Sequence, residues 1–252
     1  MDVVSSRLSL SAIYLGTALV LTSVVLGVLD APRPLINVGI TIAAFSIVSG
    51  VIGSAFGPAA RTSLAVVARR PVSTDWGTLN DPRHRVPSHG THAWGQAYAV
   101  DFWRPGHPDQ ASVLGSGGGF ARPESFLAFG QAVRAPVSGR VVVQVDGARD
   151  HRCRLGGMAR LWFHIEGVVR AFMGPRALFG NYIIIEKTNT EYVLLAHLQR
   201  KSSIVTIGDY VQDGQELAKC GNSGNSTEPH VHFQCQDKKR PLFARGMPFK
   251  FV

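Results

Sequence analysis

Two histidines, His230 and His232, stand one residue apart in a short run of apolar and aromatic residues. The run, His-Val-His-Phe-Gln, alternates like a β-strand, and side chains two apart on a strand point to the same face, roughly 7 Å apart along the backbone. One imidazole can therefore bind a metal while the other reaches the water on that metal. A polar strand face is the plain alternative, but a tight turn, Cys220–Ser226, precedes the pair and Pro229 places its first member.

Two further residues could take part in the same chemistry. His197 is the one histidine of an apolar strand-like run, Leu194–Leu198, where a hydrogen-bonded core histidine is the ordinary interpretation. Asp101 ends another apolar run, Gln96–Asp101. A buried carboxylate needs a partner or a metal, so Asp101 is the more informative of the two.

The combination resembles the lysostaphin-like zinc metallopeptidases, which cut peptide cross-links in bacterial cell walls. The resemblance covers about residues 86–240 and is strongest over residues 181–237. There Ala-His-Leu, the stretch Gly-Asp-x-Val-x-x-Gly at Gly208–Gly214, and Gly-Asn-Ser-Gly…Pro-His-Val-His-Phe occur in the order of the family. Ala135–Val141 also resembles the strand and turn that the family places before its central sheet.

The resemblance implies one tetrahedral Zn²⁺ per chain, held by two histidines and one aspartate with water in the fourth position, the open arrangement of a zinc hydrolase. Asp101 and His232 match two of the family's ligands, and His197 and His230 match the two histidines beside the water. One of these could take the proton of the water. The other could hydrogen-bond the developing oxyanion or protonate the leaving amine.

The first histidine ligand departs from the common family pattern. Common members have it four residues before the aspartate, where this chain has Ala97, which cannot bind a metal. Some relatives carry this ligand on a preceding loop, and His89 has the corresponding spacing, with Gly90 beside it to let the loop turn inward. We favour His89 over His92 as the third ligand. If neither binds, the domain is a non-catalytic relative that holds a peptide or a partner protein in the same groove.

The elements that must position these residues are short. Strand-length runs rich in Val, Ile, Tyr or Phe occur at residues 97–103, 132–145, 181–187, 192–198, 216–219 and 230–236. No long helical pattern alternates with them, so an antiparallel sheet is favoured over a parallel one. We therefore expect an all-β, antiparallel, sandwich-like domain of the lysostaphin type over residues 86–252.

Two stretches interrupt this domain, a glycine-rich loop at Gly115–Gly119 and a basic insertion at residues 147–180. Within the insertion, Leu155–Met173 carries apolar residues at roughly helical spacing. One hypothesis is a basic amphipathic segment that lies on anionic lipid or on wall polymer. The alternative is a loop whose apolar residues pack on the sheet.

The N-terminal part has a different composition. Residues 1–60 contain only Asp2, Arg7, Asp30 and Arg33 as charged groups, so the whole net charge of +9 lies on residues 61–252. The uncharged runs on either side of Asp30 each exceed the roughly 20 helical residues that a bilayer core requires. We expect a two-helix transmembrane hairpin, residues 10–29 and 35–56, as an anchor over residues 1–60, followed by a linker over residues 61–85. A cleaved signal peptide followed by a buried helix is the alternative.

The side of the membrane is contested. Three arginines, Arg61, Arg69 and Arg70, follow the second helix, whereas the turn between the helices carries only Arg33. By the positive-inside rule this distribution favours a cytoplasmic C-terminal domain. Cell-wall peptide, the substrate that the resemblance implies, lies outside the cytoplasm. We give the resemblance more weight than the arginine distribution and expect a cell-membrane protein whose C-terminal domain is extracytoplasmic.

The sequence thus predicts an integral membrane zinc endopeptidase that hydrolyses peptide bonds of peptidoglycan cross-links. The alternatives are a catalytically silent module that binds or regulates an envelope protein, and a zinc peptidase that acts on proteins. No nucleic-acid-binding motif accompanies the positive charge, so we expect no nucleic-acid partner. Cys220 and Cys235 could form a disulfide, with Cys153 unpaired; the alternative is that all three cysteines are free thiols.

Overall fold

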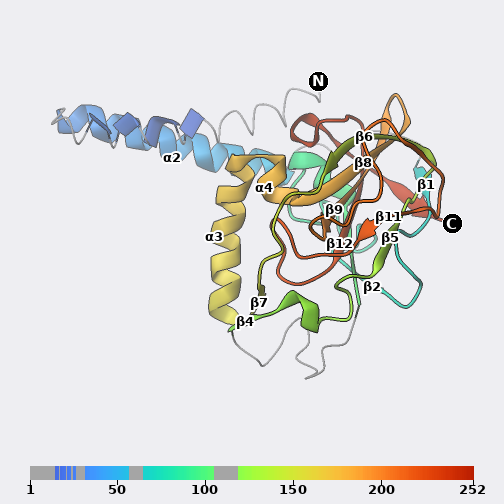
Figure 1. The fold of residues 1–252 in the computed structure, drawn as a ribbon. Coiled ribbons are helices and arrows are strands. Elements are labelled where there is room, and N and C mark those ends of the chain that lie inside the picture. The colour runs from blue at the N-terminus through green and yellow to red at the C-terminus, as the bar shows by residue number, and fades with distance from the viewer. Residues whose placement is uncertain are drawn as a thin grey trace.

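The computed structural model describes residues 15–16, 18–20, 22–23, 25–26, 32–56, 65–104 and 119–252, and the structural statements below concern these residues. Beyond position 65 the regular structure is mostly β-strand, gathered around one large sheet (Figure 1). Neighbouring strands of this sheet are antiparallel. Their order across the sheet is β10 (Tyr210–Val211), β6 (Gly139–Val145), β8 (Asn181–Thr188), β9 (Glu191–Leu198), β12 (Val231–Gln236), β3 (Val100–Trp103) and β2 (Gly77–Leu79), with β13 (Gly246–Met247) also paired to β12.

Three pairs of short strands surround the large sheet. They are β1 (Val66–Ala68) with β14 (Phe249–Phe251), β5 (Ala132–Arg134) with β11 (Glu216–Lys219), and β4 (Gly119–Ala121) with β7 (Cys153–Leu155). The β1–β14 pair is parallel and the other two are antiparallel. Short 3₁₀ turns cover Ala93–Tyr98, Pro123–Ser125 and Pro241–Phe243.

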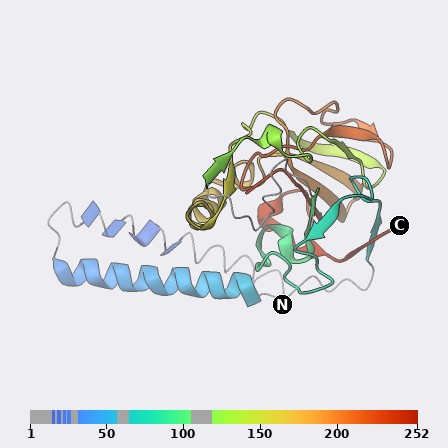
Figure 2. The ribbon, with the colours of Figure 1, turned by 90° about the horizontal axis from the view of Figure 1, so that it is seen from below.

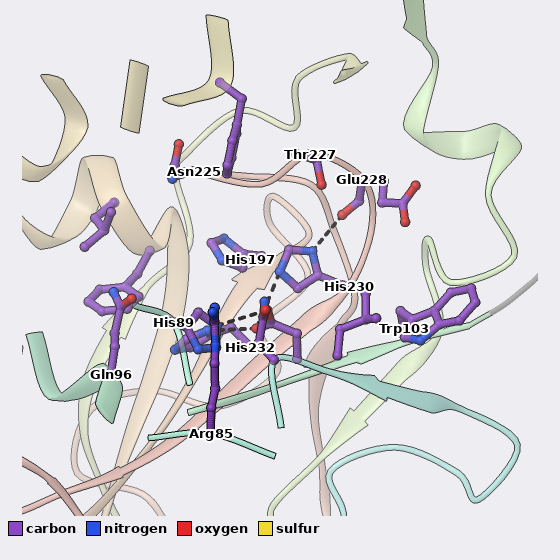
Figure 3. Close-up of a pocket in the computed structure, with 16 residues that line it drawn as sticks. Arg85, His89, Gln96, Trp103, His197, Asn225, Thr227, Glu228, His230 and His232 are labelled. Atoms are coloured by element: carbon purple, nitrogen blue, oxygen red, sulfur yellow. Dashed lines mark hydrogen bonds and ion pairs between the residues drawn. The ribbon is translucent and has the colours of Figure 1, made fainter. Parts of the chain in front are cut away.

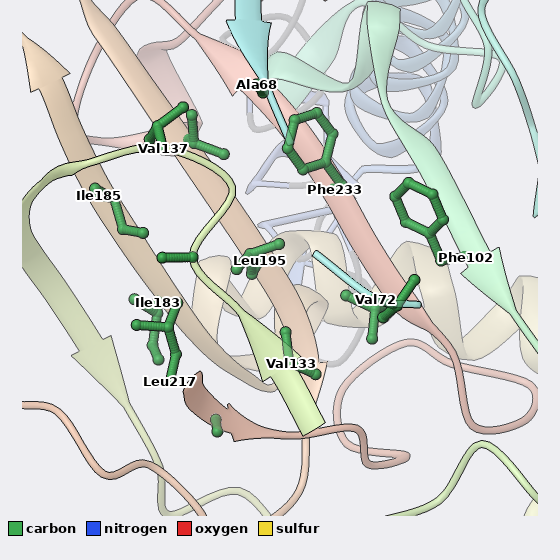
Figure 4. Packing of buried hydrophobic residues seen from close by; sticks show 14 of the residues in the cluster. Ala68, Val72, Phe102, Val133, Val137, Ile183, Ile185, Leu195, Leu217 and Phe233 are labelled. Atoms are coloured by element: carbon green, nitrogen blue, oxygen red, sulfur yellow. The ribbon is translucent and has the colours of Figure 1, made fainter. Parts of the chain in front are cut away.

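The central strands are covered on both faces, which explains why their sequences are continuously apolar. Successive side chains of a strand point to opposite faces. Ile183 and Ile185 of β8 accordingly join one buried cluster with Leu195 and Phe233, as Figure 4 shows. Ile184, between them, joins a second cluster on the other face.

Strand order decides where the chemistry-bearing residues meet. β12 lies between β9 and β3, so His232 has Asp101 as its partner on one side and Ala196 on the other. The next residue of β9 is His197, and His230 directly precedes β12. The sheet therefore places three of the predicted site residues on three neighbouring strands and a fourth, His230, directly before one of them.

The strands expected at residues 181–187, 192–198, 216–219 and 230–236 are confirmed to within one residue at each end. The range 132–145 contains two strands, β5 and β6, separated by a turn. The range 97–103 is strand only from Val100 onward, because a 3₁₀ turn with positive φ at Trp94 and Gly95 comes first.

Two expectations about the rest of the domain need correction. The range 61–85 is not simply a linker, because β1 pairs with β14 and β2 pairs with β3, so the β domain takes in residues from Val66 onward. The domain is mostly β rather than all-β, because the insertion at residues 147–180 forms helices α3 (Gly157–Met173) and α4 (Pro175–Phe179). A loop is thus the wrong interpretation of Leu155–Met173, and an amphipathic helix is the right one.

Two smaller predictions concern the glycine-rich loop and the cysteines. The loop lies outside the described residues except for Gly119, where β4 begins. Cys153, Cys220 and Cys235 are all buried and free, so the disulfide alternative is not adopted.

A long helix, α2 (Arg33–Phe56), projects away from the β domain (Figure 2). Among the described residues it is the one helix long and apolar enough to cross a membrane by length and composition, with a mean hydropathy of 1.3 over Arg33–Gly50. Residues 10–29 lie largely outside the described part. Where they are described, small residues bring them close to α2: a Cβ on Gly16 would lie 2.7 Å from the carbonyl oxygen of Ala43, and one on Gly39 would lie 2.4 Å from Oγ of Ser23. The two-helix transmembrane hairpin stays a prediction.

Candidate metal centre

Three potential metal ligands converge at one end of the large sheet (Figure 3). Asp101 comes from β3, His232 from β12 and His89 from the loop before the Ala93–Tyr98 turn. Nε2 of His89 lies 3.0 Å from Oδ2 of Asp101, and Nδ1 of His232 lies 2.9 Å from Oδ1 of the same carboxylate. Their ligand atoms all lie within 4.8 Å of one another. Two nitrogens and one carboxylate thus surround a point that a small cation could occupy.

The hydrogen bonds of His232 fix which of its nitrogens carries the proton. Nε2 of His232 lies 2.9 Å from Oε1 of Gln234, and Nε2 of Gln234 donates to the carbonyl of Trp94 and to Oε1 of Gln236. The amide of Gln234 is thereby oriented with its oxygen toward His232, so Nε2 of His232 is the donor. Nδ1 of His232 is left with a lone pair that faces Asp101.

His89 is oriented in the same way by its neighbour in the sequence. The hydroxyl of Ser88 donates to the carbonyl of Ala99 at 2.7 Å, so its oxygen is free to accept from Nδ1 of His89 at 3.2 Å. With the proton on Nδ1, the lone pair of Nε2 faces Asp101. Because a second hydrogen bond holds the ring of each of these two histidines, both imidazoles are oriented as a metal ligand would need to be.

The charge of the site also suits a cation. Asp101 is buried, and burial by itself raises its pKa; a positive charge on His89 and hydrogen bonds donated by His89 and His232 would outweigh burial and lower the pKa well below its usual range, so the carboxylate needs positive charge beside it to stay ionised. Asn80 donates a further hydrogen bond of 2.7 Å to Oδ2 of Asp101. An ionised carboxylate beside two imidazole lone pairs is electrostatically unfavourable without a cation, and imidazole nitrogen with carboxylate oxygen is a donor set that Zn²⁺ accepts.

His197 and His230 stand beside this group without belonging to it. Nδ1 of His197 lies 2.8 Å from the carbonyl of Ser223, and Nδ1 of His230 lies 2.8 Å from the carbonyl of Glu228. A carbonyl can only accept, so both rings carry a proton on Nδ1. Nε2 of His230 is 3.8 Å from Oδ1 of Asp101. The ring centroids of His197 and His230 are 4.7 Å apart.

The backbone and the protonation state of His197 are both unusual. Its φ is +61°, in the left-handed region that side chains with a Cβ rarely adopt. Burial, together with the nearby His230 and His232, lowers the pKa of His197 well below its ordinary value. The ring is therefore held neutral, with a bare nitrogen that can accept a proton.

The centre opens into a cavity of about 410 Å³. Its polar lining includes Asn80 together with Arg85, Thr227 and Glu228. In Figure 3, Arg85 lies on the side of His89, and Thr227 and Glu228 lie on the side of His230. Apolar walls come from Trp103, Phe163, Leu178 and Phe179. A cavity of this kind, with convergent titratable groups at its base, is the ordinary form of an active site.

All five predicted site residues meet here, whereas His92 does not. Burial lowers the pKa of His92, and no described residue lies within hydrogen-bond distance of its Nδ1. Sequence reasoning missed Ser88, Asn80 and Gln234. Gln234 could have been found, because it lies two residues after His232 and so on the same strand face, but nothing in the sequence points to Asn80.

Comparison with known proteins gives a family-level match over part of the chain. Residues 164–243 match the model of Peptidase family M23. The matched range contains His197, His230 and His232, whereas His89 and Asp101 lie before it.

The curated relatives share a short stretch with this chain. It is 30% identical over 99 residues to peptidoglycan DD-endopeptidase ShyC of Vibrio cholerae, which is 39% of this chain and 21% of the relative. It is 35% identical over 65 residues to peptidoglycan DD-endopeptidase ShyA of the same organism, covering 26% of this chain and 15% of the relative. The match thus spans about a fifth or less of these relatives.

Solved structures with related folds are more distant. A mutant catalytic domain of the prophage-encoded M23 protein EnpA from Enterococcus faecalis has a TM-score of 0.40 and 14% identity, over 71% of this chain and 93% of that one. A zinc-containing peptidase from Vibrio cholerae has a TM-score of 0.38 and 21% identity, over 73% of this chain and 40% of that one.

Proposed function

We propose that this chain is a membrane-anchored zinc endopeptidase that hydrolyses peptide bonds of peptidoglycan cross-links. One observation carries the proposal above all others: Nε2 of His89 and Nδ1 of His232 both lie within 3.0 Å of the carboxylate of Asp101, while the other nitrogen of each ring faces a hydrogen-bond acceptor, so each ring turns its lone pair toward Asp101. This arrangement is costly in a protein without a cation and favourable in one that binds a cation. The relatives named peptidoglycan DD-endopeptidases support the substrate class.

The three converging residues would hold one Zn²⁺ per chain through Nε2 of His89, a carboxylate oxygen of Asp101 and Nδ1 of His232. When bound, zinc supplies Lewis-acid chemistry, polarising the scissile carbonyl and lowering the pKa of a water toward neutrality. Gln234 and Ser88 keep the two imidazoles in the tautomers that this role requires.

The proton transfers fall to His197 and His230. The bare Nε2 of the neutral His197 accepts a proton from the attacking water, while Nδ1 keeps its own proton and donates it in a hydrogen bond to the carbonyl of Ser223. His230 donates to the carbonyl of Glu228 through Nδ1, and with a proton also on Nε2 it could donate to the oxyanion or to the leaving amine. The assignment could be exchanged between the two rings. In either case each ring is oriented before substrate arrives.

The membrane assignment rests on α2 and on the location of the substrate. The exposed apolar residues of α2 suit a lipid environment, and cell-wall peptide lies outside the cytoplasm. We therefore place the β domain on the extracytoplasmic side, against the excess of arginines that follows α2.

The test uses the purified full chain in detergent, loaded with zinc, and purified cross-linked muropeptide dimers. The expected product is the monomer pair, identified by mass spectrometry, with His197→Ala inactive although it binds zinc. His92→Ala is the control and should retain activity. Zinc binding without cleavage of muropeptides would indicate a silent binding module, and cleavage of an unstructured protein alone would indicate a general protein peptidase.

A further inference from the structure

The outer face of α3 is apolar and exposed. Trp162, Val168, Val169 and Met173 are between 52% and 72% accessible to solvent. At 3.6 residues per turn Trp162, Val169 and Met173 share one side of α3, and Val168 lies about 100° farther around the axis from Val169, so the four occupy a part of the helix surface that does not include Phe163 and Gly167. We call these four residues the outer face of α3. Large apolar side chains grouped in this way on one helix face mark a surface that meets an apolar partner.

The inner face of α3 is already occupied by the β domain. Phe163 lines the cavity, and a Cβ on Gly167 would lie 3.0 Å from Nδ2 of Asn225. Glu166 forms ion pairs with the buried Arg154 and, at 2.5 Å, with Arg170. These contacts fix which side of α3 faces the domain, so the outer face cannot turn inward without breaking them.

The position of α3 relative to α2 indicates what covers the outer face. In Figure 1, α2 runs across the view and α3 runs crosswise to it, at the side of the domain from which α2 projects. Figure 2 shows α3 end-on, again beside the β domain and crosswise to α2. α2 itself exposes Leu35, Val38, Phe45 and Val48. A helix that lies crosswise to a membrane-spanning helix, close to the domain end of the span, lies along the membrane surface.

We propose that the outer face of α3 lies on the lipid surface of the membrane that α2 enters, an inference that rests on the membrane anchoring proposed above. Tryptophan prefers the membrane–water interface, where Trp162 would sit. Arg176 of α4 is exposed directly after α3 and can meet anionic headgroups. Wall glycan and peptide are polar and offer no apolar phase for Val168, Val169 and Met173, so lipid is the better occupant.

The docking has a consequence for the candidate active site. Phe163 lines the cavity from the inner face, so the cavity lies about one helix diameter, roughly 10 Å, from the lipid. Arg154, paired with Glu166 of α3, also donates to the carbonyl of Ser226 at 2.7 Å, in the loop that leads to His230. α3 on the membrane thereby holds the cavity beside the membrane-proximal layer of the wall.

The test places single spin labels on the full chain in vesicles of phosphatidylethanolamine and phosphatidylglycerol. The labelled variants are Val169→Cys and Met173→Cys on α3, Ile42→Cys on α2, and Ile207→Cys on a part of the β domain remote from α3. The three native cysteines are buried, so the introduced thiol is the one that reacts. Relaxation by oxygen and by a water-soluble nickel complex then reports whether each label contacts lipid or water.

Labels on α3 and α2 should be relaxed at least fivefold more by oxygen, relative to nickel, than the label at Ile207. If the α2 label contacts lipid while both α3 labels match Ile207, the docking proposal is wrong and the anchor stands. If the α2 label contacts water, the anchor proposal itself is wrong. Protection of the α3 labels by purified cell-wall sacculi instead of by lipid would also overturn the proposal, in favour of a wall-binding surface. Circular dichroism of each variant checks that it folds.

Discussion

Replacing Gln234 with leucine should weaken zinc binding without removing any zinc ligand. Gln234 accepts the Nε2 proton of His232 at 2.9 Å, and its own amide is held by Trp94 and Gln236. Without that acceptor, His232 can instead carry its proton on Nδ1 and donate it to Asp101, the tautomer that cannot bind a metal. Loss of a partner of this kind typically costs 10- to 100-fold in metal affinity, or about 1.4 to 2.7 kcal/mol.

Gln234→Leu should also lower the free energy of unfolding. Gln234 is fully buried, so the oxygen atoms that accept hydrogen bonds from its amide would be left without a donor. The carbonyl of Trp94 and Oε1 of Gln236 each lose a hydrogen bond, at about 1 kcal/mol apiece. The metal-free variant should therefore unfold with a free energy about 2 kcal/mol below that of the wild type, measured by urea denaturation.

Gln236→Leu provides the matched control for the zinc measurement. Gln236 is equally buried and belongs to the same chain of amides, but it does not touch His232. Zinc affinity, measured by competition with a chelator, should fall at least tenfold for Gln234→Leu and by less than threefold for Gln236→Leu. Wild-type affinity in Gln234→Leu, or equal losses in both variants, would refute the tautomer argument.

Three further predictions test other parts of the account. His89→Ala should lower zinc affinity at least 100-fold in the same chelator titration, whereas His92→Ala should stay within threefold of the wild type; the reverse result would assign the ligand to His92. His197→Ala and His230→Ala should each bind zinc but lower kcat about 10²- to 10⁴-fold on muropeptide dimers, and undiminished turnover would exclude that histidine from proton transfer. Glu166→Gln should destabilise the chain by about 3 kcal/mol at pH 7, because it leaves a buried arginine unpaired. Burial raises the pKa of Glu166, but Arg170 and Arg154 outweigh burial and lower it. The ion pairs therefore stabilise the chain fully above the pKa that Glu166 has in the unfolded chain, and this stabilisation is lost as the pH falls through the lowered pKa of the folded chain. In urea denaturation the difference between Glu166→Gln and the wild type should shrink at pH 4, and a difference that does not change with pH would contradict the ion-pair explanation.

The sequence was sufficient to predict the elements whose pattern is local. The central residues of β8 and β9, Tyr182–Ile185 and Tyr192–Ala196, are continuously apolar, and the helical spacing of Leu155–Met173 is visible without any partner. The strands within the expected linker could not be predicted in this way. β1 and β2 have three residues each, and they are strands only because β14 and β3 lie beside them. A strand this short depends on its partner more than on its own sequence.

The residues of the candidate site likewise divide into those that a local sequence pattern identifies and those that only the folded structure brings to the site. Asp101 and His232 could be identified from strand-like patterns, and their pairing across β3 and β12 explains why both are needed. The choice of His89 over His92 rested on spacing, whereas in the structure Ser88 orients His89 toward Asp101. Asn80 reaches the same carboxylate from a segment expected to be a linker, and no local pattern could have placed it there.

Titration of zinc into the metal-free full chain, with cleavage of cross-linked muropeptide dimers as the readout, tests the central claim most directly. Cleavage should be absent without metal, should rise in proportion to added zinc, and should reach its maximum at one equivalent per chain. A chain that cleaves equally well without metal, or that takes up zinc and leaves the dimers intact, would contradict the account.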